Sequence, residues 1–474
     1  MLDLISTNFS DLLQNIDAII FYSIGGDQGI PIIVLWLISG GLFFTVRMQF
    51  INIRGFKHSI DVILGKYDDP NDEGEVSHFQ ALATALSGTV GLGNIAGVAI
   101  AISLGGPGAA FWMTIAGFLG MSTKFIECTL AQKYRIFNQN GTVSGGPMYY
   151  LSIGFADIGK KKLGQTLAGM FAFFNILAVL GTATIFQSNQ SQVAVANMIP
   201  FIAEKTWVYG LVLVLIVGLV TIKGIQRIAV VAAAIVPAMC GIYFLGSLWV
   251  ILSNFMAIPN ALGNIIHSAF VPQAMAGGFA GALVQGFRRA AFSNEAGLGV
   301  AAIAHAAAKT NEPIREGIVA LLEPFIDTII ICNMTALVVI ITGAYNNPEF
   351  GNFSGSALTL AAFNSSIAWF PSILTICIFL FALSTIISSS YYGQVSWQYL
   401  FGDGGVIIYK ILFLISVFIG TVTKPEAVIQ FADALKIALA FPSLLGAYFL
   451  CGKVATDLQN YMKRLETGEI IAAN

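Results

Sequence analysis

The sequence has 474 residues, of which 56% are hydrophobic and only 10% are charged. A typical soluble domain carries about 25% charged residues, so this chain has too few charges to cover a soluble protein of its length. The net charge is -2, and the sequence contains no basic block that would bind nucleic acid. The composition therefore predicts a protein embedded in a lipid bilayer.

A helix that crosses a bilayer needs about 20 mainly apolar residues, and the chain contains about eleven such runs. They cover residues 29–47, 78–104, 108–128, 165–198, 207–222, 228–253, 271–305, 316–343, 372–400, 405–421 and 428–452. We therefore predict an all-α membrane protein with about 11 transmembrane helices. Five cysteines lie singly in apolar stretches without metal-ligand spacing, which predicts packed core thiols. They are Cys128, Cys240, Cys332, Cys377 and Cys451.

Lysine and arginine are distributed unequally between the two ends of the predicted spans. If residues 1–28 lie outside, 18 of the 23 Lys and Arg residues fall at cytoplasmic ends, and only Lys205 and Lys424 at external ends. The cytoplasmic set is Arg47, Arg54, Lys57, Lys66, Lys124, Lys133, Arg135, Lys160, Lys161, Lys162, Lys223, Arg227, Lys309, Arg315, Lys410, Lys453, Lys463 and Arg464. Because cytoplasmic loops carry excess positive charge, the N-terminus is predicted outside and the C-terminus in the cytoplasm, in the cytoplasmic (inner) membrane.

Three connecting segments are long. Residues 50–76 predict a basic amphipathic surface helix followed by a solvated acidic turn, and residues 134–163 are predicted to be cytoplasmic. Residues 344–371 are predicted to form an external loop that folds back over the protein as a lid.

Two spans contain glycine-rich runs that disfavour a continuous helix. The first, Ser87–Asn94, reads SGTVGLGN, and the second, Phe292–Gly299, reads FSNEAGLG. Each glycine costs nearly 1 kcal/mol against alanine inside a helix, so local unwinding is predicted. The runs begin about 205 residues apart and each opens a block of about five spans, which is typical of inverted-repeat transporters. Close helix packing by small residues is the alternative interpretation.

Such breaks offer a defined chemistry. The N-terminus of a half-helix presents free N–H groups and a positive dipole end to a carboxylate. Unwound carbonyl groups present oxygen ligands to a small cation, and unpaired backbone is tolerated at membrane depth only where it lines a cavity. Paired breaks therefore predict one site that holds an amino acid zwitterion together with a sodium ion.

Six motifs between Pro31 and Tyr448 resemble the alanine/glycine:cation symporter family in family order. They are Ser87–Asn94, Gly105–Met113, Gly145–Tyr150, Phe292–Gly299, Phe325–Thr328 and Tyr391–Gly393. The resemblance implies a sodium-coupled amino acid symporter with the LeuT-type 5+5 inverted repeat and an extra N-terminal helix. The implied units are residues 1–28 (external segment), 29–76 (extra helix and cytoplasmic linker), 77–253 (first repeat), 254–270 (external connection), 271–452 (second repeat) and 453–474 (cytoplasmic tail).

The resemblance also implies residues that bind the substrate. Thr89 and the N–H of Gly93 would bind the substrate carboxylate at the first break. Phe292 and the carbonyl groups near Ser293 and Asn294 would face the substrate from the second break.

Further polar residues within the spans extend this implied site. Gln187 would hydrogen-bond the ligand, or alternatively form a polar clasp between helices. For sodium, the family pattern points to the hydroxyl groups of Ser384 and Thr385 with carbonyl groups of Ser87 and Val90. Without the family context, Ser384 and Thr385 would be interpreted as hydroxyl groups bonded to their own helix.

Ser389 stands where the family commonly has a tryptophan, one helical turn from Thr385 and on the same face. A serine there enlarges the pocket, so we expect substrate binding at Thr385 and Ser389 and a substrate larger or more polar than alanine, such as serine, threonine or glutamine.

Charged residues at membrane depth are functional candidates by default. Arg288 and Arg289 with Glu295 predict a charge pair that braces the second break, or a coupling gate. Glu323 and Asp327 predict a solvated vestibule, with a proton-linked role as the alternative. In the last span, Asp433 and Lys436 are expected to pair, and His78 and His305 are expected at the membrane interface.

The function predicted is secondary active transport by alternating access, which moves a small neutral amino acid into the cell with co-transported sodium. Proton coupling is the first alternative and a channel the second, although no repeated selectivity filter appears in the sequence. No catalytic motif of an enzyme is present in the spans, so we predict a non-enzyme. Membrane lipid is an expected partner, and the sequence shows no obvious protein partner.

Overall fold

The computed structural model describes residues 21–24, 29–139, 141–222, 224–271, 278–350, 353, 355–367, 369–423 and 436–470, and these residues are mostly helical. Their strands form two short antiparallel pairs. One pair joins β1 (Ser23–Ile24) to β2 (Ile30–Pro31), and the other joins β3 (Ile136–Phe137) to β4 (Val143–Ser144). Lys223, Lys424 and Asp433, which entered the charge analysis, lie outside the described residues.

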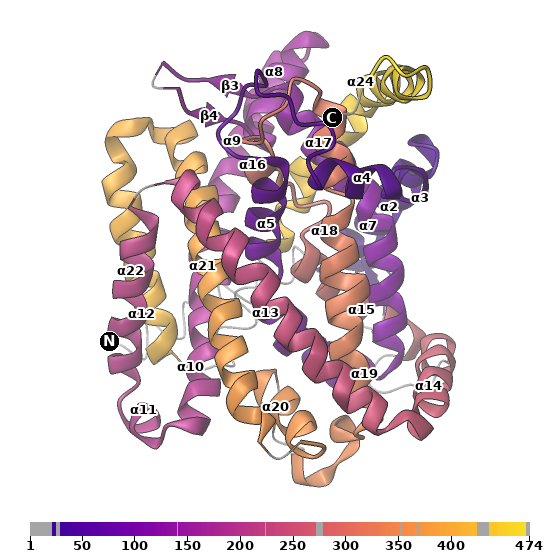
Figure 1. Cartoon of the computed structure of the whole chain (residues 1–474), viewed down its shortest axis with the longest axis vertical. Helices are drawn as coiled ribbons and strands as arrows, with labels where there is room; N and C mark the ends of the chain where they lie inside the picture. The colour runs from indigo at the N-terminus through magenta and orange to yellow at the C-terminus, as the bar shows by residue number, and fades with distance from the viewer. Residues whose placement is uncertain are drawn as a thin grey trace.

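Each of the eleven predicted spans overlaps helix in the structure (Figure 1). In chain order the main helices are α2 (Ile32–Arg47), α3 (Ile51–Arg54), α4 (Phe56–Ile63), α5 (His78–Thr89), η1 (Gly93–Gly97), α6 (Val98–Gly105), α7 (Gly108–Lys133), α8 (Pro147–Asp157), α9 (Lys161–Ala178), η2 (Val179–Phe186), α10 (Gln187–Met198), α11 (Pro200–Glu204), α12 (Thr206–Thr221), α13 (Ile225–Ser253), α14 (Ile258–Phe270), α15 (Gly278–Asn294), α16 (Ala302–His305), α17 (Pro313–Val319), α18 (Leu322–Pro324), η4 (Phe325–Cys332), α19 (Asn333–Ile341), α20 (Ser356–Asn364), α21 (Phe370–Phe401), α22 (Val406–Val422) and α24 (Ala440–Glu466).

By length and apolar composition, six helical runs among the described residues can cross a membrane. A seventh is added when the two bent halves of the first broken span count as one. Helices α2 and α12 are apolar but shorter. These helices make the chain a multi-pass membrane protein.

The connecting segments gather at two opposite ends of the bundle (Figure 1). One end carries α3, α4, α8 and the β3–β4 pair, all from segments predicted to be cytoplasmic. The opposite end carries α11, α14 and α20, all from segments predicted to be external. The grouping agrees with the alternation of spans that the positive charges predict.

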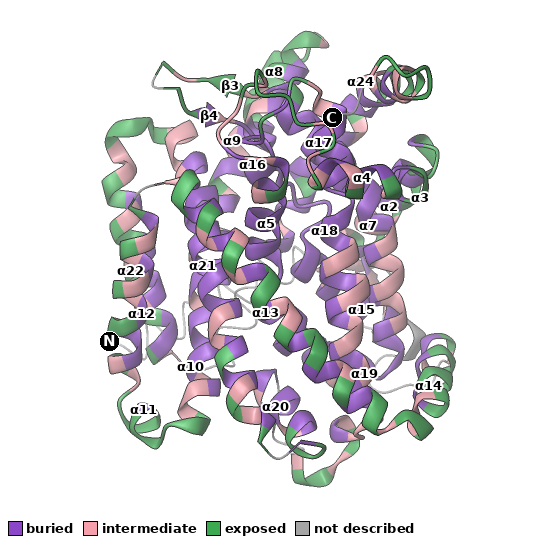
Figure 2. Cartoon of the chain, in the orientation of Figure 1, coloured by how far each residue is buried: buried purple, intermediate pink, exposed green. Residues whose placement is uncertain are grey.

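Burial separates an inner set of helices from a lipid-compatible surface (Figure 2). Helix α18 is buried along its length and α5 is buried from Ala81 to Thr89, whereas α12 and α22 are exposed along one side. The exposed side chains on α12 and α22 are large and apolar, and they include Leu215 and Ile407, each 64% exposed. Since a water-soluble surface would not display such a continuous apolar set, this side fits lipid.

The loop 344–371, which is predicted to be external, folds back onto the first broken span, as the sequence predicts. Its helix α20 reaches the broken span through Thr359, whose hydroxyl donates to the carbonyl oxygen of Ile95 at 3.1 Å. Ser356 donates to Oε1 of Gln190 at 3.3 Å. The loop therefore covers η1 from the end that carries α11 and α14.

The predicted connection 254–270 contains the helix α14, which the apolar runs do not predict. The last helix continues to Glu466, well past the predicted end of its apolar run at residue 452. The extension carries a buried stripe of Val454, Leu458 and Tyr461 between exposed polar residues. The hydropathy of this extension is too low for a membrane span, and the helical periodicity of its buried residues indicates an amphipathic helix.

His58 on α4 is a buried titratable group at the end that carries the predicted cytoplasmic segments. Its Nε2 lies 2.7 Å from the hydroxyl of Tyr461. Burial lowers the pKa of His58 to about 4, against the opposing effect of Asp61, while Arg315 lowers it further. Between about pH 6.5 and 4 the unfolded imidazole therefore binds a proton that the folded one does not, and folding stability decreases as the pH falls.

We expect the apparent melting temperature of the purified protein to fall between pH 7 and pH 5. His58→Gln, which does not titrate, should show a smaller fall. A thermal melt of both proteins across this range checks the prediction, and equal falls in the two would contradict it.

Candidate functional site

The first break separates α5 from η1 and turns the chain by 51°. Helix α5 ends at Thr89, and η1 begins at Gly93. The N–H of Gly91 donates to Oδ1 of Asn94 at 2.9 Å, and the N–H of Leu92 donates to Oε1 of Gln187 at 3.1 Å. The predicted unwinding is thus confirmed, and two amide side chains accept hydrogen bonds from two of the backbone N–H groups that it frees.

The second break follows Asn294, where α15 ends. Glu295, Gly297 and Gly299 all have left-handed backbone angles, with φ of +56°, +89° and +75°. Glycine adopts this region without a steric cost, whereas Glu295 is held there against the usual preference of a residue with a Cβ atom. The predicted unwinding is therefore also confirmed at residues 295–299.

The two breaks meet at the centre of the protein. A Cβ atom on Gly93 would lie 3.3 Å from Cδ1 of Phe292, so only a residue without a side chain fits this approach comfortably. Phe292 packs edge-to-face on Phe186 of η2, with 5.3 Å between the ring centroids. The aromatic ring of the second break thus closes directly over the backbone of the first.

Asp327 of η4 joins both breaks through hydrogen bonds. Its Oδ1 accepts from Nδ2 of Asn94 at 2.6 Å, and its Oδ2 accepts from the hydroxyl groups of Ser293 at 2.9 Å and Thr328 at 2.7 Å. Thr328 in turn accepts from Nδ2 of Asn294 at 2.8 Å. Asp327 is fully buried, which overturns the expectation of a solvated vestibule at this carboxylate.

The predicted sodium ligands of α5 and α21 lie side by side. Ser87 donates to the carbonyl oxygen of Ser384 at 2.8 Å. The hydroxyl groups of Ser384 and Thr385 each donate to the carbonyl oxygen of Phe381 at 3.0 Å. A hydroxyl that donates its proton keeps its lone pairs as acceptors, so this back-bonding leaves both oxygens able to bind a cation.

Thr385 also borders the first break. A Cβ atom on Gly91 would lie 2.4 Å from Oγ1 of Thr385 and 3.2 Å from Nε2 of Gln187. Val90, whose carbonyl is a predicted ligand, is fully buried at the same break. Thr89 is buried as well, and its hydroxyl donates to the carbonyl oxygen of Ala85 at 3.2 Å.

A small cavity lies between these elements, with a volume of about 20 Å³. Gln187, Thr385 and Ser389 line it, so the structure places three of the predicted substrate residues around one space. Glu295 and Lys436 line it from the side of the second break. Its volume is close to that of one bound water, so the site is closed around a space smaller than an amino acid.

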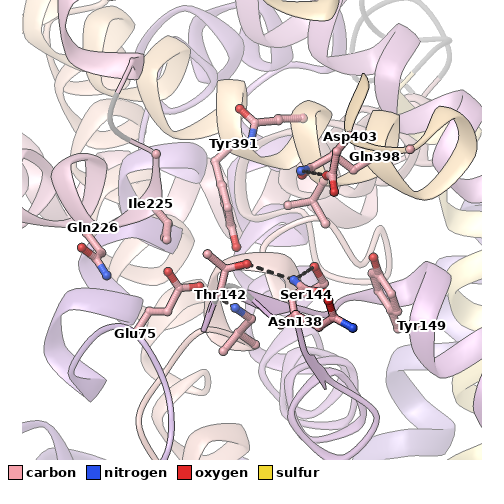
Figure 3. Close-up of a pocket in the computed structure, with 16 residues that line it drawn as sticks. Glu75, Asn138, Thr142, Ser144, Tyr149, Ile225, Gln226, Tyr391, Gln398 and Asp403 are labelled. Atoms are coloured by element: carbon pink, nitrogen blue, oxygen red, sulfur yellow. Dashed lines mark hydrogen bonds between the residues drawn. The ribbon is translucent and has the colours of Figure 1, made fainter. Parts of the chain in front are cut away.

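A larger cavity of about 780 Å³ opens at the end that carries β3 and β4 (Figure 3). Its wall includes Glu75, Gln226, Tyr391, Gln398 and Asp403. None of the predicted substrate or sodium residues lines it. This cavity is lined largely by polar side chains close to solvent. The two helix breaks, which favour the smaller cavity as the substrate site, do not contribute to its wall.

The ion pair at the second break differs from the prediction. Oε1 of Glu295 lies 2.9 Å from Nζ of Lys436, in place of the expected pairing with Arg288 or Arg289. Lys436 also donates to the carbonyl oxygen of Phe292 at 2.6 Å, and its Nζ lies 4.5 Å from the centre of the Phe292 ring. Glu295 lies in the left-handed turn after the end of α15, so the regular spacing of a helix does not predict its partner.

A second group of charged and titratable side chains lies buried away from the two breaks, where α5 begins at His78 and α16 ends at His305. Lys124 of α7 pairs with Glu323 at 3.0 Å, and His305 pairs with Glu316 at 2.6 Å, while His78 contacts the same Glu316. These side chains are at most 2% exposed. The expectation of a solvated Glu323 is therefore wrong, because its carboxylate is buried beside the ammonium group of Lys124. His78 and His305 are both buried against Glu316, and their place at the membrane interface and the cytoplasmic side of Lys124 stay predictions.

The structure brings four further polar residues to the site: Asn94, Asn175, Asp327 and Lys436. Sequence reasoning gave no individual role to Asn94 or Asn175, and it gave Asp327 and Lys436 roles other than the contacts observed here. Asn94 and Asp327 belong to the quoted motifs, and their amide and carboxylate groups in glycine-rich or apolar surroundings were the available signal. Asn175 and Lys436 carry no local signal beyond a polar group in an apolar span. Only the packing of α9 and of the segment that precedes α24 against the breaks gives them a role.

The fold is that of LeuT-type secondary transporters. A crystal structure of MhsT in complex with L-phenylalanine matches with a TM-score of 0.55 and 14% sequence identity, over 79% of this chain and 88% of that chain. The sequence profile described as the sodium:alanine symporter family matches residues 14–473, and the chain belongs to that family.

Two curated relatives show the breadth of the family. The sodium/alanine symporter AgcS of Methanococcus maripaludis is 40% identical over 432 residues, which cover 91% of this chain and 94% of AgcS. The probable sodium/glutamine symporter GlnT of Bacillus subtilis is 34% identical over 441 residues, which cover 92% of this chain and 89% of GlnT. Relatives with similar coverage thus carry names with substrates of different size.

Proposed function

We propose that the protein imports a small neutral amino acid together with sodium by alternating access. The observation that carries this proposal is the meeting of two helix breaks beside the hydroxyl groups of Ser384 and Thr385. The breaks offer carbonyl oxygens to a cation and N–H groups to the carboxylate of an amino acid zwitterion. Membership of the sodium:alanine symporter family supports the same assignment.

The substrate carboxylate is assigned to the first break, with Thr89 and the N–H of Gly93. Phe292 and the carbonyl groups of Ser293 and Asn294 form the facing wall. The side chains of Ser293 and Asn294 are engaged with Asp327 and Thr328, which leaves the backbone of this segment as the substrate-facing part. Gln187 accepts from the N–H of Leu92 in the first break and also lines the cavity. We therefore assign it both roles, the polar clasp between helices and the hydrogen bond to the ligand.

The architecture proposed with this function has eleven spans, with two five-helix halves at residues 77–253 and 271–452 and an additional helix within residues 29–76. The N-terminus lies outside and the C-terminus in the cytoplasm of the inner membrane. The bias of Lys and Arg supports this orientation, and the common end of the predicted cytoplasmic segments agrees with the alternation of the spans.

Uptake of labelled alanine, serine and glutamine into proteoliposomes tests the function. We expect saturable accumulation that requires an inward sodium gradient. Accumulation driven by a proton gradient alone would contradict sodium coupling. Linear flux without accumulation would indicate a channel, and chemical conversion of the amino acid would indicate an enzyme.

Thr385 tests the sodium ligands directly. Thr385→Val keeps the shape of the side chain but removes its oxygen, and a hydrogen bond or ligand to a charged group contributes about 1.5–3 kcal/mol. We therefore expect the sodium concentration for half-maximal uptake to rise about tenfold or more. Thr385→Ser, which keeps the hydroxyl, is the matched control. An unchanged sodium dependence in Thr385→Val would remove this residue from the cation site.

A further inference from the structure

We propose that Glu295 and Asn175 form a subsite that binds a hydrogen-bond donor on the side chain of the transported amino acid. The proposal rests on the proposed function and deepens it, because it names the chemical class of the substrate. That class is a neutral amino acid whose short side chain carries a hydroxyl or amide group.

The two acceptors lie in the wall of the 20 Å³ cavity beside Thr385 and Ser389. Oε2 of Glu295 and Oδ1 of Asn175 are buried, and neither has a hydrogen-bond partner among the residues that the structure describes. Glu295 is 5% exposed and Asn175 is 0% exposed. Because a buried acceptor without a hydrogen-bond partner is destabilising, two residues with such acceptors in the wall of one cavity indicate a ligand that donates.

The other polar atoms of these two side chains are already engaged, which fixes their orientation. Nδ2 of Asn175 donates to the hydroxyl of Ser396 at 2.8 Å and to the carbonyl oxygen of Tyr392 at 3.3 Å. Oε1 of Glu295 is held by Lys436 at 2.9 Å. Each side chain is thus anchored through one atom, and its remaining oxygen is buried without a partner in a residue that lines the cavity.

Charge decides which kind of donor fits. The ammonium group of Lys436 compensates the carboxylate of Glu295, so the pair has no net charge. A second cation placed against Glu295 would lie near this ammonium, and the repulsion between two buried positive charges is large at short range. A neutral O–H or N–H group meets no such repulsion and satisfies the free acceptors.

Size favours a small group. The cavity has room for about one water-sized group, which matches the hydroxyl of a serine side chain. Ser389 borders the same space with a small side chain. A site built around unpaired acceptors should bind an isosteric substrate that lacks the donor much less tightly.

Serine and 2-aminobutyrate form the matched pair of ligands, because they differ by a hydroxyl in place of a methyl group. We expect serine to compete for uptake of labelled alanine at a concentration at least about tenfold lower than 2-aminobutyrate. The measurement uses the purified full-length protein in proteoliposomes with a sodium gradient.

The test variant is the double substitution Glu295→Met with Lys436→Met. Removing both charges together avoids an uncompensated buried ion. We expect the ratio of the two half-inhibitory concentrations to fall to within about twofold of 1. The control is Asp157→Ala with Lys453→Met, which removes another lysine–carboxylate pair, with 3.0 Å between its charged atoms. Neither residue lines the 20 Å³ cavity, so this control should leave the ratio as in the wild type.

The outcomes separate this proposal from the general function. Sodium-dependent alanine uptake with equal competition by serine and 2-aminobutyrate in the wild type would overturn the subsite while the symporter function stands. No sodium-dependent uptake in the wild type would overturn the function itself. An unchanged ratio in the Glu295/Lys436 double variant, including equal weakening of both ligands, would overturn the subsite.

If the double variant transports too slowly for competition, the same ratio is measured as stabilisation of the purified variant against heating by the two ligands. Equal stabilisation by serine and 2-aminobutyrate supports the proposal. Greater stabilisation by serine, as in the wild type, would overturn it.

Discussion

Replacing Asp327 with alanine is expected to reduce sodium-dependent alanine uptake about 100-fold or more. The carboxylate accepts from Asn94 of the first break and Ser293 of the second, and all three groups are buried. Each donor left without a partner costs roughly 1–3 kcal/mol, and two donors at about 1.4 kcal/mol each correspond to a hundredfold change. The breaks would lose the group that joins them, so the site would no longer be held in one geometry.

Thr328→Ser is the matched control for this prediction. It lies beside Asp327 in η4 and keeps the hydroxyl that donates to the carboxylate. Uptake close to that of the wild type is expected in the control. Wild-type uptake in Asp327→Ala would show that the two breaks are positioned without this carboxylate.

Lys124→Met is expected to have the largest effect on stability. The ammonium of Lys124 is fully buried within α7 and lies 3.0 Å from the carboxylate of Glu323. Breaking a buried ion pair by removing one partner costs about 3–5 kcal/mol, because the other charge stays buried without compensation. We expect a lower melting temperature and a reduced yield of folded protein in detergent.

The double variant Lys124→Met with Glu323→Gln should recover much of the loss, since neither side chain then carries a charge. The recovery measures the coupling between the two residues in a double-mutant cycle. Additive effects of the two single substitutions would contradict a direct pairing. Melting temperatures of the four proteins under one condition provide the measurement.

Both predictions concern contacts among helices that begin or flank the broken spans. Lys124 comes from α7, Glu323 from α18, and His305, 3.6 Å from Glu323, from α16 after the second break. Asp327 continues the same chain of contacts through η4 to both breaks. A transporter that works by rocking one group of helices against the rest requires such a group to move as a unit, and these buried contacts supply the connection.

Much of the fold followed from local composition. Apolar runs located helix in all eleven predicted ranges, because the bilayer requires a long apolar helix wherever the chain crosses it. Glycine and asparagine within Ser87–Asn94 and Phe292–Gly299 located both breaks, since the helix propensity of glycine is a property of the residue itself. The boundary of α24 was missed because its final turns are amphipathic and carry charge.

The partners of the charged residues did not follow from the sequence. The predicted partner of Lys436, Asp433, lies outside the described residues, and the sequence did not predict the contact between the ammonium of Lys436 and Glu295. Asn94 and Asp327 are 233 positions apart in the chain. Such pairs depend on which helix faces pack together, and periodicity along one helix carries no information about the neighbouring helix.

The sequence by itself thus determined a membrane protein with two helix breaks and located hydroxyl groups within the span that forms α21. These properties depend on apolar length, on glycine and on side-chain chemistry, which are all local. The tertiary structure decided that the breaks meet through Phe292 and Gly93, that Asp327 joins them, and that Ser389 shares its cavity with Glu295 and Lys436. Those contacts arise only when distant helices pack, because a buried charge or acceptor is stable only beside the partner that packing brings to it.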